Sequence, residues 1–161
     1  MATDWAAGAS FRETQRFPLW IFLIPLAIEV VVAVLIATKD WRPVPLVLAP
    51  GVLIVGVWWL LRLDTRVDGN GLYVRLFPFP GRTIRPEEIV QAGVRTYRPF
   101  MDYGGWGVRW APGEGKAYNA RGNRAVQLVL KSEQRVLIGS QRAEELLAAL
   151  KQIMVEGEEG H

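Results

Sequence analysis

Two long apolar runs, residues 17–38 and 44–61, constrain the fold of this chain more than any other feature. The first run contains one ionisable residue, Glu29, and the second contains none. A helix that crosses a bilayer needs about 20 apolar residues, within a range of about 17 to 25. Neither run has the polar face that a surface helix of a globular domain keeps. The pattern predicts a transmembrane helical hairpin over residues 17–61; the alternative is a hairpin buried inside a globular domain.

The residues that flank the two runs predict an orientation for this hairpin. Tryptophan favours the headgroup layer, and tryptophans lie near the ends of both runs. Four basic residues lie outside the hairpin and two lie in the break between the runs. Because cytoplasmic loops carry the excess of Lys and Arg, we expect a two-span protein of the cell membrane with both termini in the cytoplasm. The tryptophans are Trp20, Trp41, Trp58 and Trp59, and the basic residues are Arg12, Arg16, Arg62 and Arg66 outside and Lys39 and Arg42 in the break.

Glu29 is the polar candidate inside the predicted spans. A carboxyl group in a bilayer is costly, so it is protonated, paired or near water. One interpretation is a proton or ion pathway, in which hairpins oligomerise into a small transport or channel protein. The simpler interpretation is a protonated side chain that bonds a neighbouring helix. We favour the simpler one because two helices cannot enclose a pore and the second run offers no partner charge.

Composition excludes several kinds of site. The chain has no cysteine and its one histidine is the last residue, His161. Disulfides, thiolate metal sites and Ser-His-Asp triads are therefore excluded, and we expect no metal and no cofactor. Residues 62–125 carry eleven basic and six acidic side chains, a balance that would attract anionic lipid headgroups. The arginines are scattered rather than clustered, so nucleic acid is not an expected partner.

From residue 62 onward the pattern alternates as strands do. Residues 62–67 and 72–77 predict a β-hairpin, because the Asp-Gly-Asn-Gly turn between them tolerates positive φ. Residues 1–16 are expected to be a mobile N-terminal tail. The further expected strands are 82–89, which ends in a turn, 90–100 with a bulge at Gly93, two short strands near 106–110 and 116–120, and a hairpin of 125–130 with 135–140.

The C-terminal segment predicts an amphipathic helix over residues 141–155. Its apolar residues form one stripe at helical spacing. Ser140 is placed to cap the helix, and Gly157 is expected to end it, leaving residues 158–161 as a tail. The stripe consists of Ala143, Leu146, Leu147, Leu150, Ile153 and Met154.

This order of elements resembles a pleckstrin-homology-like (PH-like) domain. The segments DYGGWGVR, AYN-x-x-GN and IGSQR-x-E-E-L are similar to a small uncharacterised family of bacterial and archaeal membrane-anchored PH-like proteins. The resemblance covers roughly residues 62–155 and implies a β-barrel of about seven strands capped by the C-terminal helix. The expected fold is therefore an α+β membrane protein with a cytoplasmic PH-like domain at residues 62–157. The resemblance implies no activity, substrate or catalytic residue.

Residues 97–124 are the candidate binding segment. They concentrate Tyr, Trp and Arg, the residue types that dominate binding hot spots. Strand alternation puts residues 106, 108 and 110 on one face and Arg109 on the other. The alternative is that Trp106 and Trp110 fill the core of the barrel while the glycines form bulges. The candidate binding residues are Arg98, Tyr103, Arg109, Tyr118, Arg121 and Arg124.

The leading functional hypothesis is non-enzymatic. A PH-like domain anchored to the lipid bilayer binds a protein partner, or a second copy of the chain, during assembly. The second hypothesis is the transport protein built around Glu29. The third is a membrane-bound enzyme, for which carboxylates are available but lie in no motif that specifies chemistry. Those carboxylates are Glu87, Glu88, Asp102 and Glu114.

Overall fold

The computed structural model describes residues 10–159, except for the side chains of Phe22 and residues 156–159. Contacts divide the chain into two compact units. One unit comprises residues 17–61, and the other comprises the remaining described residues. The second unit is therefore assembled from chain segments on both sides of the first.

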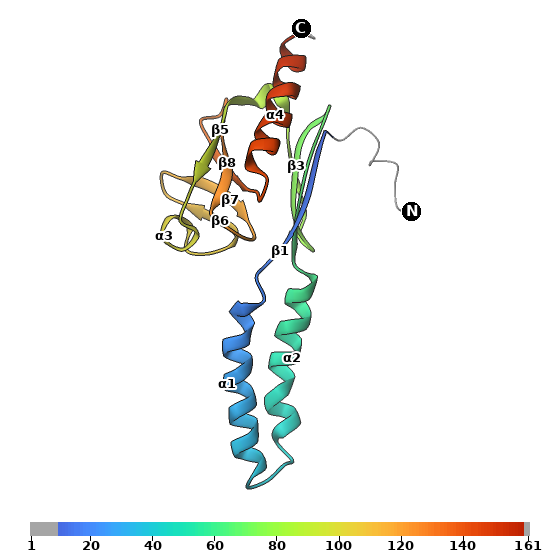
Figure 1. Cartoon of the computed structure of the whole chain (residues 1–161), viewed down its shortest axis with the longest axis vertical. Coiled ribbons are helices and arrows are strands. Elements are labelled where there is room, and N and C mark those ends of the chain that lie inside the picture. The colour runs from blue at the N-terminus through green and yellow to red at the C-terminus, as the bar shows by residue number, and fades with distance from the viewer. Residues whose placement is uncertain (1–9, 160–161) are drawn as a thin grey trace, which may run out of the picture. The chain divides into compact units, whose positions relative to one another are not determined.

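The first unit is a pair of antiparallel helices, α1 (Trp20–Ala37) and α2 (Val44–Leu60) (Figure 1). They have 18 and 17 residues, which corresponds to a rise of roughly 25–27 Å at 1.5 Å per residue. The hydrocarbon core of a bilayer is about 30 Å thick. In the part of the chain that the structure describes, no helix is long and apolar enough to cross a membrane. The predictions of a transmembrane hairpin, a two-span cell-membrane protein and cytoplasmic termini are therefore wrong.

The second unit begins with a strand that the sequence analysis assigned to a mobile tail. Residues Phe11–Arg16 form β1, which pairs antiparallel with β2 (Arg62–Asp68). The predicted β-hairpin is present as β2 and β3 (Gly71–Phe77), and the short β4 (Arg82–Ile84) completes a sheet of order β1-β2-β3-β4. Residues 1–9 of the predicted tail lie outside the described residues.

The second sheet has five strands in the order β5-β8-β9-β7-β6. All neighbours are antiparallel except β7 and β9. The expected bulge at Gly93 is instead an irregularity between Ile89 and Gln91. A short 3-10 helix, η1 (Pro86–Glu88), precedes β5, and α3 (Pro99–Tyr103) follows it. The strands are β5 (Ile89–Thr96), β6 (Gly107–Ala111), β7 (Gly115–Asn119), β8 (Arg124–Leu130) and β9 (Arg135–Gly139).

The two sheets do not close into a barrel. Within residues 10–159, no strand of one sheet pairs with a strand of the other. Helix α4 (Ala143–Glu159) instead packs against β5 and β8 of one sheet and against β1, β2 and β3 of the other (Figure 1). The predicted seven-strand PH-like barrel with a capping helix is therefore wrong, because the helix lies against both sheets. The helix also continues through Gly157, which was expected to end it.

The core of the second unit follows from strand alternation and the helical stripe. One face of β2, β3 and β4 buries Leu63, Val74 and Ile84, each at most 1% exposed. Leu146 and Leu150 of α4 are fully buried. Leu147, predicted to share this stripe, is half-buried. The facing residues of the five-stranded sheet are Val126, Leu128, Val136 and Ile138, all with no exposed area.

Polar groups on the buried face of β1 bond to the start of α4. The Glu13 side chain is 8% exposed; its Oε2 accepts a hydrogen bond from Ser140 Oγ, and its Oε1 accepts one from the Gln141 N–H at 2.9 Å. Gln15 Nε2 donates to the Gly139 carbonyl at 2.8 Å. Ser140 Oγ also accepts from the Arg142 N–H, as expected of a residue that caps the helix. A carboxylate at the positive end of a helix is stabilising, so β1 fixes the start of α4.

We expect Leu150→Ala to lower the free energy of unfolding of the full chain by about 2–5 kcal/mol, because it leaves a cavity beside the sheets. Leu147→Ala, in the same helix, should cost distinctly less because its side chain is only half-buried. Chemical denaturation monitored by circular dichroism measures both. Equal losses for the two variants would contradict the packing of α4 described above.

Candidate functional site

Helix α3, of five residues, lies near the start of the candidate binding segment. One side of this helix is buried and the other is exposed. The Arg98 N–H donates to Asp102 Oδ2 at 2.9 Å, which closes the first turn. Gly104 ends the helix at φ +70°, a conformation that favours glycine. Phe100 and Met101 project outward and are 58% and 80% exposed. Sequence reasoning had not selected these two residues as part of a surface.

The two candidate tyrosines lie in the core. Tyr103 is 5% exposed, and its Oη donates to the Glu114 carbonyl at 3.3 Å. Its ring makes an edge contact with Tyr97 in a cluster that also holds Ala117, Ala125 and Leu137. Tyr118 is 4% exposed, and Lys116 Nζ lies 5.0 Å from its ring centroid. Both rings therefore contribute to packing rather than to an exposed surface.

The two tryptophans of the segment have different surroundings. Trp106 is half-buried, with its ring 4.9 Å from that of Phe100 and its Nε1 donating to the Gly122 carbonyl at 3.4 Å. Trp110 lies on β6 and is 70% exposed. β6 is the last strand of its sheet, so only β7 pairs with it in the described structure. The interpretation that both tryptophans fill a core is therefore wrong for Trp110.

Strand β6 presents different chemistry on its two faces. Val108 and Trp110 pair with Tyr118 and Lys116 of β7, whereas Arg109 pairs with Ala117 and so lies on the opposite face. Arg109 Nε donates to the Trp106 carbonyl at 3.1 Å. Both Arg109 and Phe100 lie within 4 Å of the position that a Cβ would take at Gly105, so their side chains border the same point. Helix α3 contacts β6. We call the exposed residues on both faces of β6, together with those of α3, the edge patch; it consists of Phe100, Met101, Val108, Arg109 and Trp110.

The remaining candidate arginines are exposed, and they divide into two groups. Arg124 forms an ion pair with Glu144 in the first turn of α4, and both side chains are exposed. Arg98 directly precedes α3. The Arg121 carbonyl accepts a hydrogen bond from Gln141 Nε2, and the next residue, Gly122, contacts Trp106. Arg124 is therefore paired with α4, whereas Arg98 lies beside α3 and Arg121 lies next to the glycine that bonds Trp106.

A hollow of about 240 Å³ lies on the face of β5, β8 and β9 and was not predicted. Arg95 borders it and forms an ion pair with Glu114. The hydrogen bond that Arg95 donates to the Glu114 carboxylate lowers the pKa of Glu114 and raises the pKa of Arg95. Burial of the two groups opposes both pKa shifts. A carboxylate held in this way is a poor general base near neutral pH. The hollow is lined by Gln91, Gly93, Val94, Arg95, Gln127, Val129 and Arg135.

Two of the other three carboxylates proposed for catalysis, Asp102 and Glu87, also have a partner in the second unit. Asp102 accepts the Arg98 N–H, and Glu87 lies 4.0 Å from Arg85. Within the described residues, no group of three or more His, Cys, Asp or Glu side chains is placed to hold a metal ion. The structure therefore does not bring the four carboxylates together into one site.

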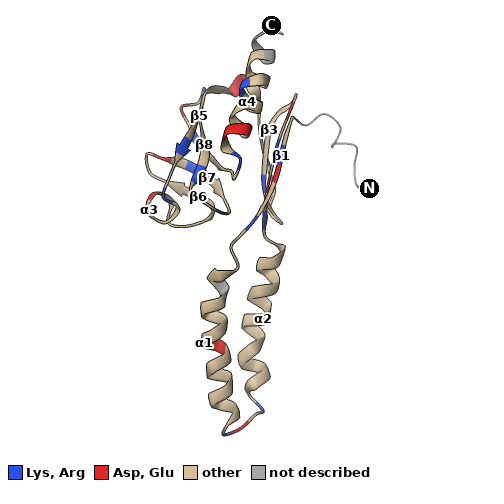
Figure 2. Ribbon diagram, in the orientation of Figure 1, with Lys and Arg blue, Asp and Glu red and all other residues tan. Residues whose placement is uncertain are grey.

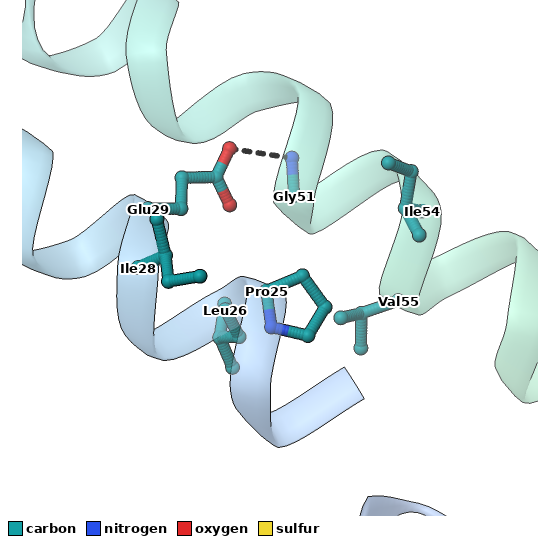
Figure 3. A pocket seen from close by; sticks show the side chains of 7 residues that line it. All are labelled: Pro25, Leu26, Ile28, Glu29, Gly51, Ile54 and Val55. Atoms are coloured by element: carbon teal, nitrogen blue, oxygen red, sulfur yellow. Dashed lines mark hydrogen bonds between the residues drawn. The ribbon is translucent and has the colours of Figure 1, made fainter. Parts of the chain in front are cut away.

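Glu29 bonds within its own helical hairpin. Its Oε1 accepts the Gly51 N–H of α2 at 2.9 Å (Figure 3). Pro50 precedes this glycine and has no N–H to donate to the helix ladder. The bond crosses a cavity region of about 300 Å³ lined by Pro25, Leu26, Ile28, Ile54 and Val55 as well as by the bonded pair. The carboxyl group therefore bonds the neighbouring helix of its own hairpin.

The close approach at Gly51 generates a prediction. A Cβ added at Gly51 would lie 1.5 Å from Glu29 Oε2, whereas one added at Gly56 meets nothing within 4 Å. Alanine favours a helix over glycine by about 1 kcal/mol, so Gly56→Ala should stabilise the chain. Gly51→Ala should be less stable than Gly56→Ala by about 1–3 kcal/mol, because the displaced carboxyl group loses its partner.

A double-mutant cycle with Glu29→Ala checks this explanation. In that background the two glycine substitutions should have similar effects on thermal unfolding. A Gly51→Ala penalty that persists without the Glu29 side chain would contradict the proposed steric conflict.

The buried Tyr97 generates a pH-dependent prediction. Burial raises the pKa of Tyr97 to about 12, and the Asn119 side chain opposes part of the shift. The pKa of Tyr97 in the folded chain exceeds its value near 10 in the unfolded chain, so the unfolded chain releases this proton first. The protonated tyrosine therefore contributes its full stability to the fold below pH 10, and this contribution is lost as the pH rises towards 12. Between pH 10 and 12, the free energy of unfolding of the wild type should fall by on the order of 2 kcal/mol because of Tyr97, and Tyr97→Phe should not show this fall. Denaturation at pH 8 to 12 measures it, with the half-exposed Tyr73→Phe as control; equal slopes for both variants would contradict the assignment.

Comparison with known proteins does not place the chain in a family. No family model, curated protein or solved structure matches it. The resemblance to membrane-anchored PH-like proteins therefore stays a prediction.

Proposed function

We propose that this chain is a non-catalytic interaction protein that binds an extended partner segment along β6. The observation that supports this proposal is the edge position of β6 combined with the 70% exposure of Trp110. An edge strand offers unpaired backbone N–H and C=O groups. An extended segment that adds as a further strand pairs with these groups and gains specificity from alternate side chains.

The residues of the edge patch favour a binding role over a purely structural one. Trp and Arg are enriched in binding hot spots, and the patch exposes Trp110 and Arg109 beside Phe100 and Met101. An exposed apolar strand edge promotes unwanted pairing, so proteins commonly blunt or cover it. A partner strand would cover this edge and bury the tryptophan at the same time.

The alternation of β6 specifies the chemistry of the partner. Side chains on one face of an added strand would meet Val108 and Trp110, and those on the other face would meet Arg109. Arg98 and Arg121 add positive charge to the same segment, where Asp102 is already bonded to the Arg98 N–H. Charge complementarity across an interface favours association. The partner segment should therefore alternate between apolar and acidic residues.

The two other hypotheses have less support. The transport hypothesis needs helices that cross a membrane, and the described helices do not meet that requirement. The enzymatic hypothesis needs convergent reactive groups, whereas Glu114 is paired with Arg95 and Asp102 closes the first turn of α3. The edge patch is the surface whose chemistry the packing of the second unit leaves unexplained.

The test uses the full chain and a synthetic peptide of alternating Glu and Val, titrated by calorimetry. We expect Trp110→Ala to weaken binding by roughly thirtyfold, which corresponds to about 2 kcal/mol. Arg109→Ala should weaken binding of this peptide but not of a Gln–Val analogue. Val90→Ala is the matched control, because Val90 is 60% exposed on β5 at the opposite edge of the same sheet.

A second arm of the experiment probes the backbone. Peptides N-methylated at every second residue lose either the donors that face β6 or those that face solvent. One methylated series should therefore bind and the other should not. Equal binding of the two series, no binding of the parent peptide, or equal effects of Trp110→Ala and Val90→Ala would contradict strand addition at β6.

A further inference from the structure

The helical hairpin exposes most of the large apolar side chains on the described surface. Of the twenty-six exposed large hydrophobic residues, nineteen belong to residues 19–60, with exposed fractions from 38% to 78%. Leu46, Val52 and Leu53 of α2 are each at least 67% exposed. Figure 2 shows that almost no charged residues accompany them along the two helices. Exposed apolar surfaces of this extent mark interaction sites.

Contacts within the hairpin bury little of this surface. Helix α2 has no buried residue, and Ala33 is the buried residue among the described side chains of α1. A helix that is apolar on all sides is normally enclosed by other apolar elements. One helix of the same hairpin covers only one side of each, so the outward sides need a further partner.

We propose that the helical hairpins of two copies of this chain pack against each other as a four-helix assembly. The occupant must be as apolar as the hairpin, because α1 and α2 offer no charged group except Glu29. One oxygen of that carboxylate already accepts the Gly51 N–H. The same hairpin on a second copy supplies this chemistry, and a two-fold axis allows the same surface to serve both partners.

The exposed apolar area of the hairpin is of the order that a dimer interface takes. A large apolar side chain presents roughly 60–120 Å² of apolar surface, from 1.5–3 kcal/mol at 25 cal/mol per Å². Nineteen side chains that are about half exposed therefore present roughly 600–1,100 Å² over all sides of the hairpin together. A stable interface takes about 800 Å² from each partner. Summed over its sides, the exposed apolar surface of one hairpin is thus comparable in size to one side of a dimer interface.

The cavity between α1 and α2 offers a place for a side chain of the second copy. Figure 3 shows Pro25 of α1 and Val55 of α2 at the same part of the cavity, and Ile54 directly precedes Val55 on α2. Its volume of about 300 Å³ exceeds that of one large apolar side chain. Packed helices insert side chains of one into hollows formed by the other. The cavity therefore allows a specific fit between the two copies, which the uniformly apolar chemistry of the hairpin surface would not provide by itself.

This inference does not depend on strand addition at β6. It involves residues 17–61, which form a separate compact unit from the one that carries Trp110. A variant of the hairpin should change the mass of the particle without abolishing peptide binding, and a variant of β6 should do the reverse.

Sedimentation equilibrium of the full chain tests the proposal. We expect a dimer in wild type, and Val52→Gln or Leu53→Gln should weaken self-association at least tenfold. Val155→Gln is the matched control, because Val155 is 56% exposed on α4. Circular dichroism of each variant reports whether the helices remain folded, so that loss of association is separated from unfolding.

Cross-linking provides a second measurement. The chain contains no cysteine, so Leu53→Cys introduces a single thiol on the exposed side of α2. A mild oxidant should cross-link this variant to a dimer far faster than Val155→Cys. A monomer at all concentrations, association unaffected by Val52→Gln and Leu53→Gln, or a monomer whose hairpin takes up detergent or lipid instead would each overturn the proposal.

Discussion

The second unit depends on the pairing of β1 with β2 across the entire helical hairpin. Arg16 and Arg62 face each other in this ladder, although residues 17–61 lie between them in the sequence. Closing a long loop costs conformational entropy, which grows only slowly with loop length. The antiparallel course of α1 and α2 returns the chain to its starting point. The ladder continues from Arg16↔Arg62 to Phe11↔Val67, and it places Glu13 at the start of α4. Strand β1 therefore contributes both to the four-stranded sheet and to the start of α4, and its pairing with β2 joins the two ends of the helical hairpin.

The regular elements could largely be predicted from local patterns. The turn at residues 68–71 and the alternation around it located β2 and β3, and the apolar stripe located α4. Strand β1 could not be recognised in this way, because its buried face consists of Phe11, Glu13 and Gln15. Two of these three residues are polar and become buried only because the start of α4 supplies hydrogen-bond partners. Such partners are distant in the sequence, so alternation alone does not reveal the strand.

The wrong predictions about the membrane-spanning helices and the barrel also arose because local patterns do not show how distant segments are arranged. Apolar composition located the two helices of the hairpin, but helix ends decide their length, and α1 begins at Trp20 rather than at the first apolar residue. The order of strands did not follow from their positions along the chain, because β7 pairs in parallel with β9. That order makes β6 an edge strand, and so it decides that Trp110 is exposed. The opposite facing of Arg109 was predictable because alternation is a local property. The burial of Tyr103 and Tyr118 was not, because it depends on α3 and on the strands beside β7.

The two proposed surfaces would reinforce each other if both operate. A strand added at a five-residue edge makes few contacts, so a single site of this size is expected to bind weakly. Dimerisation through the helical hairpin would place two β6 edges on one particle. A partner with two acidic-apolar segments would then bind its second segment within the same particle, at an effective concentration set by the linker between them. The helical hairpin has few polar groups that could select a partner. Through dimerisation, it would nevertheless determine how strongly the partner binds along β6.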